Sequence, residues 1–215
     1  AAAARGPVLA VFFIDRLLRA QGAASRWRLE RGLRAFDAEL RRRSGRGALI
    51  LRGEPDQLLP GLATTLGAAE VHQNDWPAPE MRTLQARVNA ALQAGGRRLV
   101  LHPGHLLVHP RLVRTKTGGS YRVYTPFARA LRGIGPDQPG AYAPARITQA
   151  APPAKGLALE DMNLAPDLHG GRAVLERHAL PAGEEAALAR LDALLDRVTD
   201  YETRRDRADL EATSG

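Results

Sequence analysis

The alternation of short apolar runs with longer amphipathic stretches across the first hundred residues constrains the fold more than any other feature. The first run, Val8–Ile14, is β-branched and aromatic without polar alternation, which is typical of a strand buried on both faces of a parallel sheet. Further short strands are predicted at residues 48–51, 70–73 and 98–101. Leucines recur every three or four residues between them, which predicts helices over residues 25–43, 56–66 and 78–94.

Strands that alternate with helices of this length predict an α/β fold with a doubly wound, Rossmann-like parallel sheet. Ser25 and Asp56 are the predicted N-caps of the first two helices. Open parallel sheets bind ligands at the carboxyl ends of their strands. We therefore expect a binding region in the loops that begin near Asp15, Gly53, Asn74 and His102.

The sequence changes character after residue 134. Prolines and glycines are dense from Ile134 to Pro153, a composition that no regular element tolerates. Apolar residues return at spacings of three and four between Ala187 and Val198, which predicts an amphipathic helix. We therefore expect an α/β domain over residues 1–134, an interdomain linker over 135–180, and the beginning of a helical domain over 181–215.

Several classes of site are excluded by what the sequence lacks. It has no cysteine, which excludes disulfides, thiolate metal sites and cysteine nucleophiles. It also lacks a Walker-type phosphate loop, a GxSxG motif and an HExxH motif. No apolar run approaches the roughly 18 residues needed to span a bilayer, so a cytoplasmic protein without a membrane segment is expected.

Three histidines, His102, His105 and His109, are spaced by three and four residues, as in some metal sites. Pro103 and Pro110 prevent a helix there, and no carboxylate lies nearby in the sequence. We therefore favour solvated loop histidines over a metal site.

Positive charge is concentrated in one part of the chain. The net charge is +8, and the stretch from Met81 to Arg146 holds eleven basic residues against a single acid, Asp137. Clustered arginines attract phosphates and other anions, which indicates an anionic partner or cofactor. An arginine-rich surface that reflects only genome composition is an interpretation of equal weight.

One segment connects these general features to a known family. Residues 116–127, Lys-Thr-Gly-Gly-Ser-Tyr-Arg-Val-Tyr-Thr-Pro-Phe, combine a glycine turn with a predicted helix start, in which Thr125 is the N-cap and Pro126 the first helical residue. The segment resembles the Gly-x-x-Tyr-x-Val-Phe-Thr-Pro-Phe signature of the photolyase and cryptochrome family. Further resemblances follow in the family's order at Val8–Asp15, Leu51–Pro55, Pro181–Ala187, Tyr201–Asp206 and Ala212–Gly215.

The resemblance implies a class I type deoxyribodipyrimidine photolyase with an α/β antenna domain, a linker and an all-α flavin domain. Such a protein is a lyase that binds UV-damaged DNA as a monomer and splits pyrimidine dimers by electron transfer from reduced flavin adenine dinucleotide (FAD) in blue light. It also holds an antenna chromophore of folate or deazaflavin type. Its identity is left open because the residues after Asn74-Asp75-Trp76 depart from the family pattern.

The resemblance also implies roles for particular residues near the C-terminal end of the sequence. Tyr201, Thr213 and Ser214 would contact the phosphates or the ribityl region of FAD, and Arg205 would contact a DNA phosphate near the lesion. The competing interpretation of Arg205 is an ordinary ion pair with Asp206 or Glu202. No catalytic residue and no metal ligand is assigned within the chain.

Two parts of the family pattern are absent from the sequence. Ala1–Ala4 resembles the end of the helix that follows the family's first, central strand, and most of the flavin domain is missing. A fragment that is inactive and unstable by itself is therefore expected. A cryptochrome-like flavin photosensor without repair activity is the alternative, and an α/β domain for an unrelated nucleotide is a weaker third interpretation.

Overall fold

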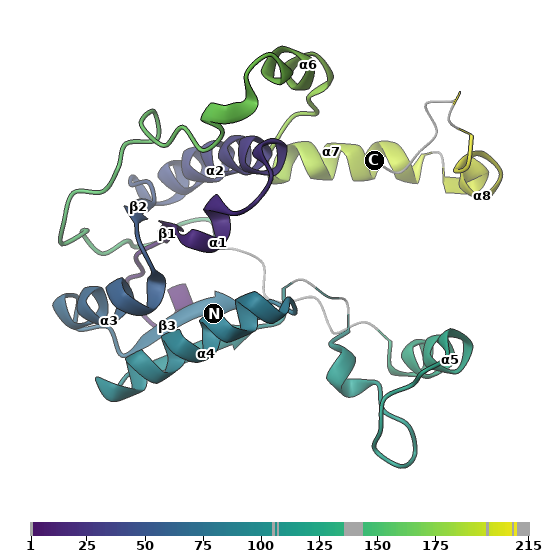
Figure 1. Ribbon diagram of the computed structural model, residues 1–215, viewed down its shortest axis with the longest axis horizontal. Coiled ribbons are helices and arrows are strands. Elements are labelled where there is room, and N and C mark those ends of the chain that lie inside the picture. The colour runs from purple at the N-terminus through teal and green to yellow at the C-terminus, as the bar shows by residue number, and fades with distance from the viewer. Residues whose placement is uncertain are drawn as a thin grey trace. The chain divides into compact units, whose positions relative to one another are not determined.

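The computed structural model describes residues 2–104, 106, 108–135, 144–196, 198–207 and 209. The chain divides into two compact units, which are described separately below (Figure 1). Unit 1 comprises Ala1–Leu9 and Arg52–Lys155, and unit 2 comprises Ala10–Leu51 and Gly156–Gly215. No helix in the described ranges is long and apolar enough to cross a membrane.

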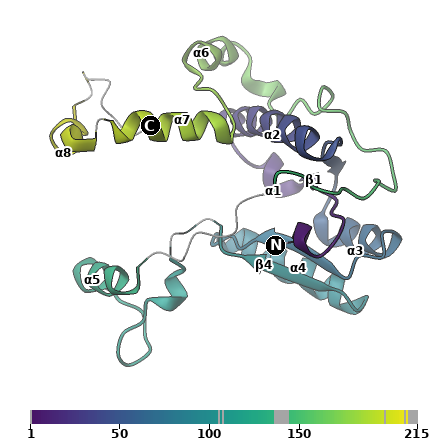
Figure 2. The same cartoon turned by 180° about the vertical axis from the view of Figure 1, so that it is seen from behind.

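Unit 1 is built on two parallel strands, β3 (Glu70–Asn74) and β4 (Arg98–His102), paired in register from Glu70 opposite Arg98 to Asn74 opposite His102. The helix α4 (Pro79–Ala94) connects them and lies beside α3 (Pro55–Thr65), as both views show (Figures 1 and 2). Buried Leu84, Val88 and Leu92 recur every four residues along α4 and form its packed face. The unit also contains η1 (Ala2–Ala4), η2 (Pro110–Leu112) and α5 (Tyr124–Ile134).

Unit 2 contains a second two-stranded sheet, in which β1 (Val11–Ile14) pairs with β2 (Leu49–Arg52). Its helical elements are α1 (Arg16–Arg19), α2 (Ala23–Ser44), η3 (Pro166–Leu168), α6 (Gly171–His178), α7 (Glu184–Leu195), η4 (Val198–Asp200) and α8 (Tyr201–Arg204). The α/β class predicted for the first part of the chain, followed by a helical part, is confirmed. The described strands form two separate pairs.

The core of unit 2 contains side chains from two segments, one before and one after the proline-rich stretch. Ile14, Leu18, Leu33 and Ile50 pack with Met162 and Leu164, and Met162 is fully buried. The segment predicted as a linker thus contributes core side chains as well as the helix α6.

Polar contacts fix the same segment to α2. Glu30 accepts a 2.8 Å hydrogen bond from the backbone N–H of Leu164, and Arg26 forms a 2.7 Å ion pair with Asp167. The first contact satisfies a backbone N–H of buried Leu164 that would otherwise have no acceptor in the turn after Met162.

A buried carboxylate connects the end of α2 to the start of β2. Asp37 is 1% exposed, and its Oδ1 accepts a 2.7 Å hydrogen bond from the Ala48 N–H while its Oδ2 accepts a 2.6 Å bond from Arg41 Nε. A Cβ added at Gly47 would overlap Oδ1 of Asp37. The short connection after α2 therefore depends on Asp37 and on the absence of a side chain at position 47.

Three helix starts differ from the sequence prediction. The N-cap of α2 is Gly22 rather than Ser25, because the chain turns into the helix three residues earlier. The N-cap of α3 is Glu54 rather than Asp56, since Pro55 takes the first helical position that proline favours. For α5 the N-cap is Val123 rather than Thr125, because the first turn tolerates Pro126, which has no N–H to donate.

The first predicted strand is shorter than its apolar run. Regular pairing begins at Val11, and Val8 instead forms an isolated parallel bridge with Gln149 in unit 1. Backbone hydrogen bonds of 2.9 Å run from Val8 N–H to Thr148 and from Ala150 N–H to Val8. The apolar run is thus divided between two partners, which local sequence does not reveal.

Candidate functional site

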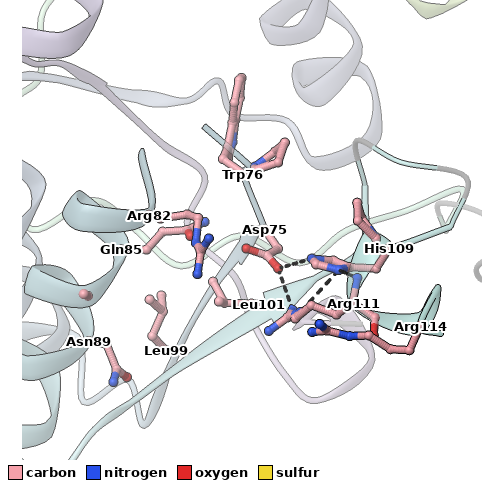
Figure 3. Close-up of a pocket in the computed structure, with 13 residues that line it drawn as sticks. Asp75, Trp76, Arg82, Gln85, Asn89, Leu99, Leu101, His109, Arg111 and Arg114 are labelled. Carbon is pink, nitrogen blue, oxygen red and sulfur yellow. Dashed lines mark hydrogen bonds and ion pairs between the residues drawn. The ribbon is translucent and has the colours of Figure 1, made fainter. Parts of the chain in front are cut away.

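A pocket of about 690 Å³ lies in unit 1, beside the ends of β3 and β4 (Figure 3). Pockets of a few hundred cubic ångströms are the usual size for small-molecule and cofactor sites. Four parts of the chain line this pocket: the turn after β3, one face of α4, the strand β4, and the loop around η2. The lining residues are Asp75, Trp76, Pro77, Arg82, Gln85, Ala86, Asn89, Leu99, Leu101, His109, Pro110, Arg111 and Arg114.

Strand and helix periodicity determine which side chains line the pocket. Leu99 and Leu101 are two residues apart on β4, so both lie on the face of the sheet that α4 covers. Arg82, Gln85 and Asn89 are spaced by three and four on α4 and share the helix face next to them. The result is an apolar floor bordered by polar and cationic groups.

Gln85 positions α4 against the end of β3. Its side chain is only 6% exposed, and its Nε2 donates a 3.1 Å hydrogen bond to the backbone carbonyl of Asn74. The turn after β3 is also held from the other strand, because the Asp75 N–H donates to the His102 carbonyl at 2.8 Å. These bonds place Asp75 and Trp76 at the pocket.

Asp75, His109 and Arg111 form a hydrogen-bonded cluster on one wall (Figure 3). Asp75 Oδ2 lies 3.0 Å from Arg111 Nη2 and 3.3 Å from His109 Nε2. His109 Nδ1 accepts from the backbone N–H of Arg111 at 3.1 Å and from its Nε at 3.2 Å. Since Nδ1 is an acceptor, the ring hydrogen of neutral His109 lies on Nε2 and points to the carboxylate.

Two further arginines, Arg82 and Arg114, line the pocket. Asp75 neutralises Arg111, whereas Arg82 and Arg114 form no ion pair within the described ranges. The nearby indole of Trp76 is 42% exposed and offers a flat apolar surface. An aromatic plane, an apolar floor and two guanidinium groups suit a planar ligand that carries an acidic group.

Only part of the binding region predicted from strand ends comes together here. The loops that follow Asn74 and His102 provide Asp75, Trp76 and His109. Asp15 instead caps α1, where its Oδ1 accepts the Leu18 N–H at 2.7 Å. Gly53 adopts φ +137° in the turn before α3 and does not line the pocket.

The residues assigned by family resemblance lie elsewhere in the chain. Tyr201 begins α8 and is half-buried, and Arg205 is exposed one residue after that helix. Arg205 Nε lies 3.7 Å from Asp206 Oδ2, so the ion pair named as its competing interpretation is present. Thr213 and Ser214 lie outside the described residues.

Sequence reasoning placed Arg82, Arg111 and Arg114 in a basic stretch but did not assign them to a site. The spacing of Arg82, Gln85 and Asn89 was a usable signal, because it places three polar residues on one helix face. The loop arginines had no comparable signal, since irregular backbone decides where they point. Within the described part of the chain, no group of three histidines or carboxylates is arranged to hold a metal ion.

Comparisons with known proteins give the context of this site. A family model described as DNA photolyase matches residues 1–145. A deoxyribodipyrimidine photo-lyase from Agrobacterium fabrum is 32% identical over 212 residues, which cover 97% of this chain and 43% of the relative. Another from Thermus thermophilus is 33% identical and is matched over 99% of this chain and 45% of the relative. The chain therefore spans less than half the length of these relatives.

Solved structures of photolyases and cryptochromes also match nearly the whole chain. A bacterial class III photolyase from Agrobacterium tumefaciens superposes with a TM-score of 0.84 at 30% identity, covering 97% of this chain and 43% of that one. A cryptochrome from Synechocystis shares the fold with a TM-score of 0.78 at 22% identity, covering 98% of this chain and 46% of that one. The resemblance indicated by the glycine turn and the Thr-Pro helix start is confirmed: the chain belongs to the DNA photolyase family.

Proposed function

We propose that this chain is part of a deoxyribodipyrimidine photolyase, an enzyme that repairs UV-damaged DNA by splitting pyrimidine dimers in blue light. The observation that carries the proposal is the match to relatives of that name over 97% and more of the chain. The class I type remains a prediction, because the relative of known class is a class III photolyase.

FAD would supply the electron transfer that splits the dimer. Of the residues expected to hold it, Tyr201 is compatible with that role. Its side chain is half-buried, and within the described residues its hydroxyl has no hydrogen-bond partner, so it is available to a phosphate or ribityl oxygen. Thr213 and Ser214 stay as predictions for the same site.

The pocket of unit 1 is our proposed site for the antenna chromophore of folate or deazaflavin type. Both classes combine a planar ring system with acidic groups. Trp76 would lie against the ring, and Arg82 and Arg114 would bind the acidic groups, because neither is neutralised within the described ranges. The proposal gives the excess of basic residues in this part of the sequence a specific use.

Arg205 is our proposed contact to DNA phosphate. It is 55% exposed, and its ion pair with Asp206 is long and solvated, so replacing Asp206 by a phosphate would cost little. UV-damaged DNA would bind as the anionic partner, and the damaged bases would leave the stack to reach the flavin.

Repair is tested with protein expressed from its complete gene. A dimer-containing oligonucleotide is illuminated with blue light in the presence of a reductant, and intact dimers are counted by chromatography. We expect light-dependent loss of the dimer and none in the dark. Flavin binding without dimer loss would contradict repair and support the cryptochrome-like photosensor, whose fold this chain shares.

The pocket is tested separately by following the chromophore's absorption after purification or after addition of folate or deazaflavin. The double substitution Arg82→Ala and Arg114→Ala should abolish retention. Arg132→Ala, which removes an exposed arginine of α5, is the matched control and should retain the chromophore. Equal retention by both variants would place the chromophore elsewhere.

A further inference from the structure

The face of the β3–β4 pair opposite α4 carries a cluster of titratable side chains that the proposed function does not use. Glu70 and His72 lie two residues apart on β3, and His102 ends β4, so all three are on the same face. Arg5 and Arg98 both form ion pairs with Glu70. The cluster belongs to the same strands whose ends carry the pocket.

The two imidazoles meet directly. His72 Nδ1 lies 2.9 Å from His102 Nε2, and the ring planes differ by only 9° with centroids 5.2 Å apart. On its other side, His72 Nε2 lies 3.2 Å from Glu70 Oε2. The side chains form a chain of contacts from Glu70 through His72 to His102.

These contacts determine where the ring hydrogens lie when both histidines are neutral. His72 Nε2 faces a carboxylate and must carry a hydrogen, because a lone pair there would be repelled. His72 Nδ1 is then an acceptor, so the hydrogen between the rings belongs to His102 Nε2. A single ring hydrogen therefore lies between His72 Nδ1 and His102 Nε2.

We propose that His72 and His102 form an acid-sensitive latch across β3 and β4, closed while one hydrogen lies between the rings and opened when both rings are protonated. A first added proton is accepted at Nδ1 of His102, and the contact persists. A second proton on His72 Nδ1 would place two N–H groups against each other at 2.9 Å and two positive charges side by side. The strand pair must then separate at this point.

The surrounding charges favour opening in acid. Burial lowers the pKa of His102, and the positive charges of His72 and Arg5 lower it further. Glu70 is the carboxylate of the cluster, and Arg98 and Arg5 already bind it. The folded unit therefore holds fewer protons than the unfolded chain, so the latch stabilises the strands above about pH 6.5 and loses that effect as pH falls.

Opening the latch would affect the pocket as well as the sheet. The backbone carbonyl of His102 accepts the Asp75 N–H at 2.8 Å, and this bond holds the turn that carries Trp76. Separation of the strand ends would release that turn. Binding in the pocket would thus depend on pH, although the latch lies on the opposite face of the sheet.

The latch is tested by hydrogen exchange and mass spectrometry on the protein expressed from its complete gene between pH 7.5 and 5.0, after correction for intrinsic exchange rates. We expect exchange in β3 and β4 to rise at least about tenfold, because two adjacent positive charges would oppose the paired strands. His102→Gln keeps a donor toward His72 but cannot be protonated, so its exchange should change less than about threefold. His178→Gln removes an exposed histidine of unit 2 and should behave like wild type.

Equal loss of protection in wild type and His102→Gln would overturn the proposal. So would a wild-type rise no larger in β3 and β4 than in α2 of unit 2. Should His102→Gln fail to fold, the wild-type protein provides the test. Its histidine rings are labelled with carbon-13, and the titrations of His72 and His102 are followed by NMR. Two midpoints separated by more than about one pH unit support the latch, and two coincident midpoints near about 6.5 contradict it.

Discussion

Removing the Asp37 carboxylate should destabilise unit 2 more than its single side chain suggests. In Asp37→Ala the partly buried Ala48 N–H loses its acceptor, which costs about 1 to 3 kcal/mol. The bond to Arg41 adds less than about 1 kcal/mol, since the Arg41 side chain is 59% exposed. The expected loss in free energy of unfolding is therefore about 1 to 4 kcal/mol.

Urea unfolding followed by tryptophan fluorescence measures this loss. Trp27 lies buried in α2, within unit 2, so a Trp76→Phe background leaves one reporter for that unit. With a slope of about 1 to 2 kcal/mol per molar urea, the midpoint should fall by about 2 M. A midpoint within about 0.5 M of the background would refute our account of Asp37.

A second substitution tests the same reasoning through packing. Gly47→Ala should destabilise unit 2 by itself, because its Cβ would overlap Oδ1 of Asp37 and displace the carboxylate from its donors. In the Asp37→Ala background the carboxylate is gone and only the flexible end of the Arg41 side chain lies near that Cβ, so the added cost should shrink by about 1 to 2 kcal/mol. Additive costs would mean that Gly47 is required for another reason.

Three further predictions concern charge. Arg205→Ala should weaken binding of the full-length protein to damaged and undamaged duplex alike, measured by fluorescence anisotropy. The slope of the logarithm of the binding constant against the logarithm of salt concentration should fall by about one. An unchanged slope would remove Arg205 from the DNA face. The double substitution of Arg82 and Arg114 should make unit 1 bind an anionic chromophore at least about tenfold more weakly, whereas a neutral ring analogue should lose less in the same titration. Hydrogen bonding to Arg87 lowers the pKa of Asp56, so this pair should stabilise unit 1 above the ordinary aspartate pKa and lose that effect as pH falls. Arg87→Met should therefore weaken the dependence of the unfolding free energy on pH in acid. An unchanged dependence would contradict the assignment.

Periodicity made much of unit 1 and unit 2 predictable. The stripe of Leu84, Val88 and Leu92 correctly indicated α4, and the apolar run at residues 98–101 correctly indicated β4. Helix starts were less predictable, because a glycine or proline turned the chain before the polar residue chosen as a cap. Local signals compete at such positions, and the tertiary path decides between them.

Long-range contacts were the part that sequence could not supply. Nothing near Met162 or Leu164 in the sequence indicates that they pack against Ile14 and Ile50. The pocket shows the same limit, because Arg111 and Arg114 reach it from an irregular loop whose path depends on the Asp75 cluster. Family resemblance supplied Tyr201 and Arg205, which stay predictions about a larger binding site.

The burial of Met162 makes its oxidation a report of how often the core of unit 2 opens. The sequence has two methionines, and Met81 in unit 1 is half-buried, whereas Met162 is fully enclosed. Peroxide oxidises accessible thioethers to sulfoxides and cannot reach an enclosed one until the core opens. Because the sulfoxide is polar and no longer fits among Ile14, Leu33 and Ile50, each oxidation would also prevent the core from closing again. Oxidative damage at this position would thus accumulate only in molecules that have already opened.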